Sequence, residues 1–180
     1  MLIHAGVGHV AIQLAKIKGA EVAVTVSTPE KAAFARSLGA DHIIMYKDES
    51  FVDSINAWTH DKGVDIILDT VGGDLIEQSF AATKVYGDVV TILGTPTNIN
   101  FGVARKRNIR FTQELMLTPT MMELEEAKFH QGEILKQAAE LFQQGKLTVK
   151  IAATFPLSQA KEVHNALEEN HPMGKVVLTI

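Results

Sequence analysis

Gly6-Val7-Gly8-His9-Val10-Ala11 is the stretch that decides the fold. It has the form G-x-G-x-x-A and lies between a short apolar run and residues 7–17, whose apolar side chains recur at helical spacing. A glycine turn between a strand and a helix lets a pyrophosphate reach the backbone amides and the positive dipole end of that helix. The stretch therefore predicts a dinucleotide-binding turn in which Gly6, Val7 and Gly8 contact the cofactor. The simpler interpretation is a turn that only reverses the chain.

Strand and helix patterns alternate along the first two thirds of the sequence. Apolar, β-branched runs predict strands, and apolar residues three and four apart predict helices. The expected strands are 2–5, 21–26, 41–46, 64–69, 87–93 and 108–117, and the expected helices are 7–17, 29–38, 51–59 and 74–84. Nearly unbroken apolar strands between amphipathic helices indicate a parallel sheet covered on both faces. We therefore predict an α/β fold with a doubly wound parallel sheet, that is, a Rossmann-like NAD(P)-binding domain.

After Pro119 the pattern changes to one long helix followed by a short tail. The helix is expected over 121–144, and the tail holds a strand over 147–155, a helix over 159–169 and a strand over 175–180. We place the dinucleotide-binding domain at 1–146 and the C-terminal tail at 147–180.

Composition excludes several classes of protein. The 180 residues carry 17 Lys and Arg against 21 Asp and Glu, a net charge of −4, which argues against a nucleic-acid binder. The absence of cysteine excludes disulfides, a catalytic thiolate and a cysteine zinc site. No apolar stretch is long enough to span a membrane, and the N-terminus lacks the positive flank of a signal peptide. We expect a cytoplasmic protein with no nucleic-acid or membrane partner.

The end of the second expected strand bears on cofactor choice. NAD-binding units place an acidic residue about 20 residues past the glycines, on the ribose 2′-hydroxyl. Ser27 stands there instead, and Lys31 follows one helical turn later. A cation and hydroxyl donors favour a 2′-phosphate, so the pattern predicts NADP(H) in preference to NAD(H), bound by Ser27 and Lys31. The alternative is that Lys31 is a solvated lysine and Ser27-Thr28 only a helix cap.

The carboxyl ends of two further strands should line the same crevice. They carry Asp69-Thr70-Val71-Gly72-Gly73 and Leu93-Gly94. Gly72 and Gly94 would let a flat ring lie against the backbone, and both are predicted to bind the cofactor. Taken alone, Gly72-Gly73 is more typical of a loop before a helix than of a cofactor site, and Asp69 is expected to anchor that loop by hydrogen bonds.

No catalytic or metal-binding residue is predicted. The seven histidines form no pair at metal-ligand spacing, and His4 is expected in a buried strand. His9 falls in the first helical turn, near the expected phosphates. The basic run 105–110 is interpreted as a solvated loop, and Met116, Met121 and Met122 as residues that pack an interface or pocket wall.

These residues together resemble the medium-chain dehydrogenase/reductase superfamily. The resemblance is carried by residues 2–16, Ser27-Thr28-Pro29-Glu30-Lys31, Asp69-Thr70-Val71-Gly72-Gly73, Thr91-Ile92-Leu93-Gly94 and Gly174-Lys175-Val176-Val177-Leu178. The most similar branch is the zinc-free quinone oxidoreductases, similar to zeta-crystallin. It implies NADPH-dependent hydride transfer to a small-molecule quinone, enal or enone, and homodimers paired through sheet edges. It also implies the 2′-phosphate on Ser27 and Lys31 and the nicotinamide near Gly94.

Two departures from the family pattern limit these expectations. The phosphate loop is about three residues shorter than is usual, which reduces the number of backbone donors. The family's N-terminal, GroES-like substrate domain, on which residues 147–180 would partly pack, is not in the sequence. We therefore expect little activity from the isolated chain. The alternatives are a non-catalytic dinucleotide-binding or dimerisation module and, with less support, an S-adenosylmethionine-binding methyltransferase-like domain.

Overall fold

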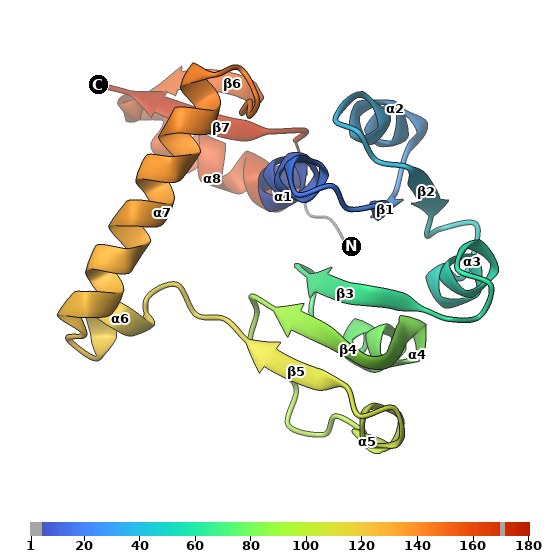
Figure 1. Cartoon of the computed structure of the whole chain (residues 1–180). Coiled ribbons are helices and arrows are strands. Elements are labelled where there is room, and N and C mark those ends of the chain that lie inside the picture. Colours follow the sequence, from blue (N-terminus) through green and yellow to red (C-terminus); the bar gives the residue numbers. More distant parts are fainter. Residues whose placement is uncertain (1–4, 170–171) are drawn as a thin grey trace.

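The computed structural model describes residues 5–169 and 172–180 (Figure 1). Parallel strands alternate with helices in it, and the expected α/β, Rossmann-like arrangement is confirmed. The described strands form three parallel sheets, with orders β1-β2, β3-β4-β5 and β6-β7. Residues 2–4 of the first expected strand, His4 among them, lie outside the described residues.

The N-terminal unit consists of α1 (Ala5–Ile17), β1 (Ala23–Val26), α2 (Pro29–Ser37) and β2 (His42–Met45). Thr28 caps α2 by accepting a hydrogen bond from the Lys31 backbone N–H, and Pro29 occupies the first helical position, as the sequence predicts. Ile12, Val24 and Ala35 lie in the core between these elements. This packing brings α1 and α2 to the carboxyl end of β1.

The central unit contains a three-stranded sheet with helices on one face. Its elements are α3 (Phe51–Trp58), β3 (Val64–Asp69), α4 (Leu75–Ala82), β4 (Thr83–Thr91), α5 (Gly102–Lys106) and β5 (Arg110–Gln113). Ile67 and Val89 from the sheet pack with Phe80 and Ile76 of α4 in the larger of the two cores. Asp69 ends β3, so the loop that follows opens at the carboxyl edge of the sheet.

The C-terminal unit returns to α1. It comprises α6 (Thr118–Met121), α7 (Glu125–Gln143), β6 (Ile151–Pro156), the 3-10 turn η1 (Leu157–Gln159), α8 (Ala160–Glu169) and β7 (Lys175–Thr179). The Gln13 side chain on α1 donates to the backbone oxygen of Thr148 (2.9 Å) and accepts from its N–H (2.9 Å). Figure 1 shows the β6–β7 sheet and α8 beside α1. The tail is therefore attached to the helix that begins at the glycines.

The structure corrects the predicted turn at Gly6-Val7-Gly8. These residues belong to α1, which begins at Ala5, and neither glycine takes a positive φ. A turn between a strand and a helix would require a residue with non-helical dihedral angles. Gly6, Val7 and Gly8 all have helical ones, because α1 extends through both glycines. The backbone N–H groups of Gly6, Val7 and Gly8 are thus those of a first helical turn.

Three expected boundaries are also wrong. Thr83 and Lys84 belong to β4 rather than to the helix before it, because Thr83 pairs with Val64. The strand expected over 147–155 begins only at Ile151. The strand expected within 108–117 is confirmed as β5, which is short because it has partners only along the last four residues of β4. The helix expected over 121–144 is divided into α6 and α7 by Glu123, which has a φ of 54°.

The basic run is more ordered than a solvated loop. Gly102–Lys106 forms α5. Arg107 donates from one guanidinium nitrogen to the backbone oxygens of Ala81 (2.8 Å) and Thr83 (2.7 Å), and Arg110 forms an ion pair with Asp88. The run therefore ties α5 and β5 to the end of α4 and to β4. Within the described part of the chain, no helix is both long enough and apolar enough to cross a membrane.

Candidate functional site

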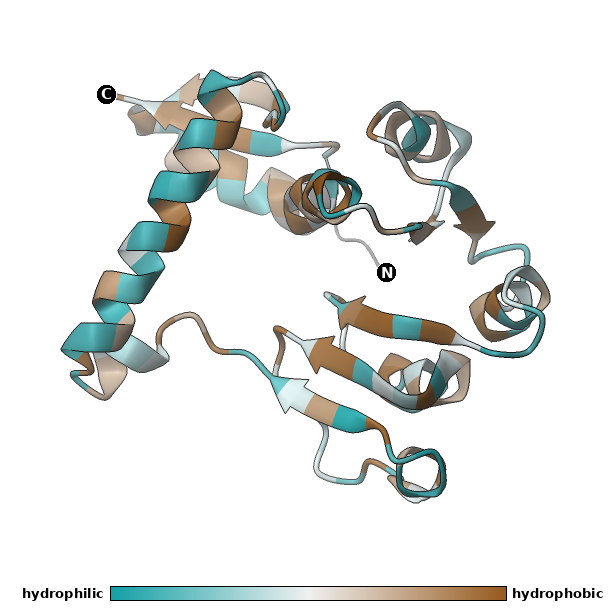
Figure 2. Ribbon diagram, in the orientation of Figure 1, coloured by the Kyte–Doolittle hydropathy of each residue, from teal (hydrophilic) through white to brown (hydrophobic). Residues whose placement is uncertain are grey.

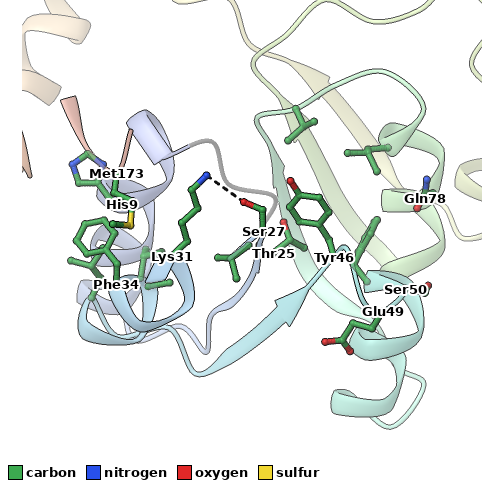
Figure 3. A pocket seen from close by; sticks show the side chains of 17 residues that line it. His9, Thr25, Ser27, Lys31, Phe34, Tyr46, Glu49, Ser50, Gln78 and Met173 are labelled. Atoms are coloured by element: carbon green, nitrogen blue, oxygen red, sulfur yellow. Dashed lines mark hydrogen bonds between the residues drawn. The ribbon is translucent and has the colours of Figure 1, made fainter. Parts of the chain in front are cut away.

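A cavity of about 520 Å³ opens at the carboxyl ends of the strands (Figure 3). Its lining comes from the ends of β1 and β2, the loop after β3, one side of α1 and of α2, the starts of α3 and α4, and the turn before β7. In open α/β sheets ligands bind outside the carboxyl ends of the strands. The cavity therefore lies where the sequence predicts the cofactor crevice.

Ser27 and Lys31 form the polar part of the cavity beside β1. The Lys31 ammonium donates to the Ser27 hydroxyl at 3.3 Å, and Figure 3 shows both side chains on the same wall. The Glu30 carboxylate lies in the first turn of α2, where hydrogen bonds from its own backbone N–H and then from the Thr28 hydroxyl lower the pKa of the carboxyl group. Ser27 and Lys31 thus present a hydroxyl and a cation, with no carboxylate directly after β1.

Residues from β2 and the following loop form the opposite wall. Tyr46 follows the last residue of β2 and lines the cavity, and Ser50 caps α3 by accepting from the Asp53 backbone N–H. Glu49 is the one carboxylate in the cavity lining among the described residues, and it accepts a hydrogen bond from the Met45 backbone N–H (3.2 Å). The negative charge of the site is therefore held at the β2 end, in the loop between β2 and α3.

The remaining wall beside α1 is apolar and closely packed. His9 is 2% exposed, and its Nε2 accepts a hydrogen bond from the Lys150 backbone N–H at 3.4 Å. The Lys150 ammonium lies 4.7 Å from the centre of the Phe34 ring, and Met173 comes from the turn before β7. The C-terminal tail therefore closes this end of the cavity.

The first turn of α1 lies next to a second cation. A Cβ atom built on Gly6 would stand 3.5 Å from the Lys175 ammonium. Unpaired N–H groups at a helix N-terminus attract anions, and an adjacent lysine strengthens that field. Gly6, Val7 and Gly8 do not line the cavity itself, so this positive corner is separate from the wall formed by Ser27 and Lys31.

Asp69 organises the loop after β3, as the sequence predicts. Its buried carboxylate accepts hydrogen bonds from the backbone N–H groups of Val71 (2.9 Å) and Gly72 (2.9 and 3.1 Å). Gly72 has a φ of +75°, and an added Cβ would stand 3.3 Å from a Leu93 methyl group. Gly72 is thus required by the loop conformation and by packing against Leu93. Val71 is the residue of this loop that lines the cavity.

Of the seven predicted cofactor-binding residues, the cavity unites two. Ser27 and Lys31 line it, whereas Gly6, Val7, Gly8, Gly72 and Gly94 do not. Gly94 lies on an exposed loop where an added Cβ would meet nothing within 4 Å. The prediction from sequence missed Tyr46 and Met173, although Tyr46 directly follows a predicted strand and the rule of carboxyl ends applies to it as well.

Within residues 5–169 and 172–180, no group of three histidines, aspartates or glutamates is placed to hold a metal ion. The described side chains therefore offer no metal site of that kind.

The comparison with protein families decides what this fold is. Residues 38–178 match the family model described as zinc-binding dehydrogenase. The chain belongs to this family. The resemblance to the medium-chain dehydrogenase/reductase superfamily is thereby confirmed, and the chain corresponds to the C-terminal cofactor-binding domain of its members.

Two curated relatives in the family are enzymes. The chain is 30% identical to 2-haloacrylate reductase from Burkholderia sp. over 182 residues, covering 99% of this chain and 54% of the relative. It is also 30% identical to quinone oxidoreductase 1 from Escherichia coli K12 over 185 residues, covering 98% of this chain and 55% of the relative. The chain thus spans about half the length of these relatives.

A crystal structure shows the same architecture. Escherichia coli quinone oxidoreductase complexed with NADPH superimposes with a TM-score of 0.82 at 28% identity, over 99% of this chain and 56% of the relative. The homologues support a nicotinamide-dinucleotide-binding oxidoreductase domain.

Proposed function

We propose that this chain is the NADP(H)-binding part of a zinc-independent reductase that transfers a hydride from NADPH to a small quinone, enone or enal. The observation that carries the proposal is the wall formed by Ser27 and Lys31 at the carboxyl end of β1. The similarity to a quinone oxidoreductase and to 2-haloacrylate reductase supports the reaction class. The finer substrate within that class is proposed from these relatives.

The preference for NADP(H) over NAD(H) follows from charge. A 2′-phosphate next to an ammonium and a hydroxyl gains charge-assisted hydrogen bonds, which are stronger than those between neutral groups. Lys31 is the one lysine or arginine in the cavity lining among the described residues. NAD(H) has no phosphate to use this cation, so Lys31 would contribute to selectivity rather than to general affinity.

The chain's own residues would bind and orient the cofactor. Ser27 and Lys31 would hold the adenosine phosphate, and Tyr46 and Val71 would line the cavity beside the adenosine. The first turn of α1, with Lys175 beside Gly6, would receive the pyrophosphate. Gly72 and Gly94 would lie near the cofactor on its way toward the nicotinamide end. When bound, NADPH supplies the hydride, and the protein supplies position and electrostatics.

The domain limits and the assembly complete the proposal. We assign residues 1–146 to dinucleotide binding and residues 147–180 to a tail that packs partly on a substrate domain. The unpaired outer edge of β5 would join a second copy to form a homodimer, because among the described strands β5 pairs only with β4. The location would be cytoplasmic.

Fluorescence titration with NADPH and with NADH tests the proposal. We expect Lys31→Met to weaken NADPH binding by at least about 10-fold, because a hydrogen bond to a charged group contributes roughly 1.5–3 kcal/mol. NADH binding should change less than about threefold. Lys62→Met is the matched control, because Lys62 is exposed and lies just before the amino end of β3, away from the carboxyl ends that line the cavity. This variant should change the binding of neither cofactor.

Equal losses for both cofactors in Lys31→Met, or no binding of either by the unmodified chain, would contradict the proposal. A steady-state assay with NADPH and 1,4-benzoquinone distinguishes a reductase from a binding module. We expect little turnover by the chain alone, since it spans about half the length of its relatives. Turnover at ordinary enzyme rates would overturn the expectation that a further domain completes the active site.

A further inference from the structure

The loop between β2 and α3 brings Tyr46 to the cavity although none of its own residues is buried. Residues 46–50 are all exposed, and Tyr46 is 53% exposed. Figure 2 shows the change from the hydrophobic end of β2 to this hydrophilic loop. A segment with few buried apolar contacts opens easily, so burial contributes little to the conformation of this loop. Hydrogen bonds must therefore set its conformation.

One hydrogen bond ties Tyr46 to the wall that contains Ser27. The Tyr46 backbone N–H donates to the backbone oxygen of Val26 at 3.2 Å, and Val26 directly precedes Ser27. Backbone groups alternate in direction along a strand, so the N–H and the oxygen of Met45 point away from β1. Among the described strands, β2 pairs only with β1. The polar groups of Met45 therefore face the unpaired edge of β2.

Glu49 closes this unpaired edge. The Met45 backbone N–H donates to the Oε1 atom of Glu49 at 3.2 Å. In return, the backbone oxygen of Met45 accepts hydrogen bonds from the N–H groups of Asp48 (2.8 Å) and Glu49 (3.1 Å). Met45 and Glu49 are thus joined twice, once through the Glu49 side chain and once through its backbone. Tyr46 is the first residue inside the turn that this pair closes.

We infer that Glu49 is a positioning residue for cofactor binding, which acts through Tyr46. The inference rests on the proposed binding of NADP(H) in this cavity and requires no contact between Glu49 and the cofactor. Figure 3 shows Tyr46 across the cavity from Lys31, with Glu49 on the loop beside it. Ordering a loop when a ligand binds lowers affinity, and a loop that is ordered beforehand avoids this loss. Glu49 orders the backbone of Tyr46 before the cofactor arrives.

The chemistry of the contact separates positioning from charge. A carboxylate close to a ligand that carries phosphates repels it, so the charge of Glu49 by itself would weaken cofactor binding. The Met45 N–H requires only an oxygen acceptor, and a side-chain amide also provides one. Glu49→Gln therefore keeps the positioning contact and removes the charge, whereas Glu49→Ala removes both.

The test combines titration with NADPH, followed by fluorescence, and amide hydrogen exchange without cofactor. Asp48→Ala is the matched control, because it removes the same charge from the same turn and leaves the Asp48 backbone N–H free to donate to Met45. Tyr46→Ala, alone and combined with Glu49→Ala, shows whether Glu49 acts through Tyr46. Urea unfolding of each variant checks that the fold is intact.

We expect Glu49→Ala to weaken NADPH binding about 3–10-fold and to speed exchange of the Met45 amide by a similar factor, since one hydrogen bond is lost. Glu49→Gln and Asp48→Ala should each change NADPH binding by less than about twofold. In the Tyr46→Ala background, Glu49→Ala should also change binding by less than about twofold, because the side chain that it positions is gone. The urea midpoint should move little in Glu49→Ala, since the contact is exposed and water can replace the carboxylate.

Three results would overturn the inference while the proposed function stands. They are unchanged NADPH binding in Glu49→Ala, tighter NADPH binding in both Glu49→Gln and Asp48→Ala, which would show a charge effect, and a loss in Glu49→Ala that persists in the Tyr46→Ala background. Absence of NADPH binding by the unmodified chain would instead overturn the proposed function, and this inference with it.

Discussion

Removing the Asp69 carboxylate tests how the loop after β3 is held at the cavity edge. In Asp69→Ala, the backbone N–H groups of Val71 and Gly72 lose their acceptor. A buried donor left unsatisfied costs about 1–3 kcal/mol. Because the Val71 N–H is only partly buried and water can reach it, we expect a total loss of about 2–4 kcal/mol.

Asp69→Asn separates geometry from charge. One side-chain oxygen remains at the position that accepts from both Val71 and Gly72, while the second contact with Gly72 at 3.1 Å is lost. A single net hydrogen bond contributes about 0.5–1.5 kcal/mol, so this variant should lose about 1 kcal/mol. Asp74→Ala is the matched control. Asp74 precedes α4 without a side-chain capping hydrogen bond, so its removal should cost no more than about 0.5 kcal/mol.

The assay is urea unfolding followed by the fluorescence of Trp58, the single tryptophan. Trp58 stacks on His42 with ring centres 5.2 Å apart, away from the mutated loop, and so reports global unfolding. A loss below about 1 kcal/mol in Asp69→Ala, or an equal loss in Asp74→Ala, would refute the argument that the two N–H contacts hold the loop.

Three further predictions concern side chains that tie separate elements together. The hydrogen bond from the Lys16 ammonium lowers the pKa of Asp41, so this pair stabilises the protein above the unfolded pKa of about 4 and ceases to do so as the pH falls through the lower folded value. In urea titrations, Asp41→Asn should therefore lower the free energy of unfolding by about 0.5–1 kcal/mol at pH 7. Near pH 2 the variant should be as stable as the unmodified protein. Gln13→Leu should cost about 2–3 kcal/mol in thermal unfolding and expose the Thr148 amide to hydrogen exchange, because both Thr148 backbone groups lose their partner; unchanged exchange would contradict it. Arg107→Met should cost about 1–2 kcal/mol by leaving two carbonyls unpaired, whereas Lys106→Met should be neutral in the same assay.

The elements that sequence predicts well are those whose signals are local. The cap and proline before α2 place its start correctly, and the apolar run of β3 gives its limits without error. The division between α6 and α7 was missed because apolar spacing continues across Glu123, whose positive φ leaves no signature in the pattern. The strand β5 was predicted within 108–117, but its limits were missed for a different reason. Its length is determined by its partner β4, and pairing between distant strands is invisible to a local pattern.

The candidate site shows the same division between local and distant information. Asp69 could be predicted as a loop anchor because its partners lie two and three residues away. Met173 and the proximity of Lys175 to Gly6 could not, since both depend on the tail returning past α1. No spacing rule connects residues so far apart in the sequence. A prediction from one sequence therefore finds the strand ends and misses what the tail adds.

The helix cap and the proposed cofactor site at the end of β1 share the same residues. The Thr28 hydroxyl accepts from the Lys31 backbone N–H at 3.3 Å, and this contact fixes the first turn of α2. The same turn brings the Lys31 ammonium to 3.3 Å from the Ser27 hydroxyl. Because Thr28 sets the backbone position of Lys31, loss of the cap would move the cation that we propose selects NADP(H).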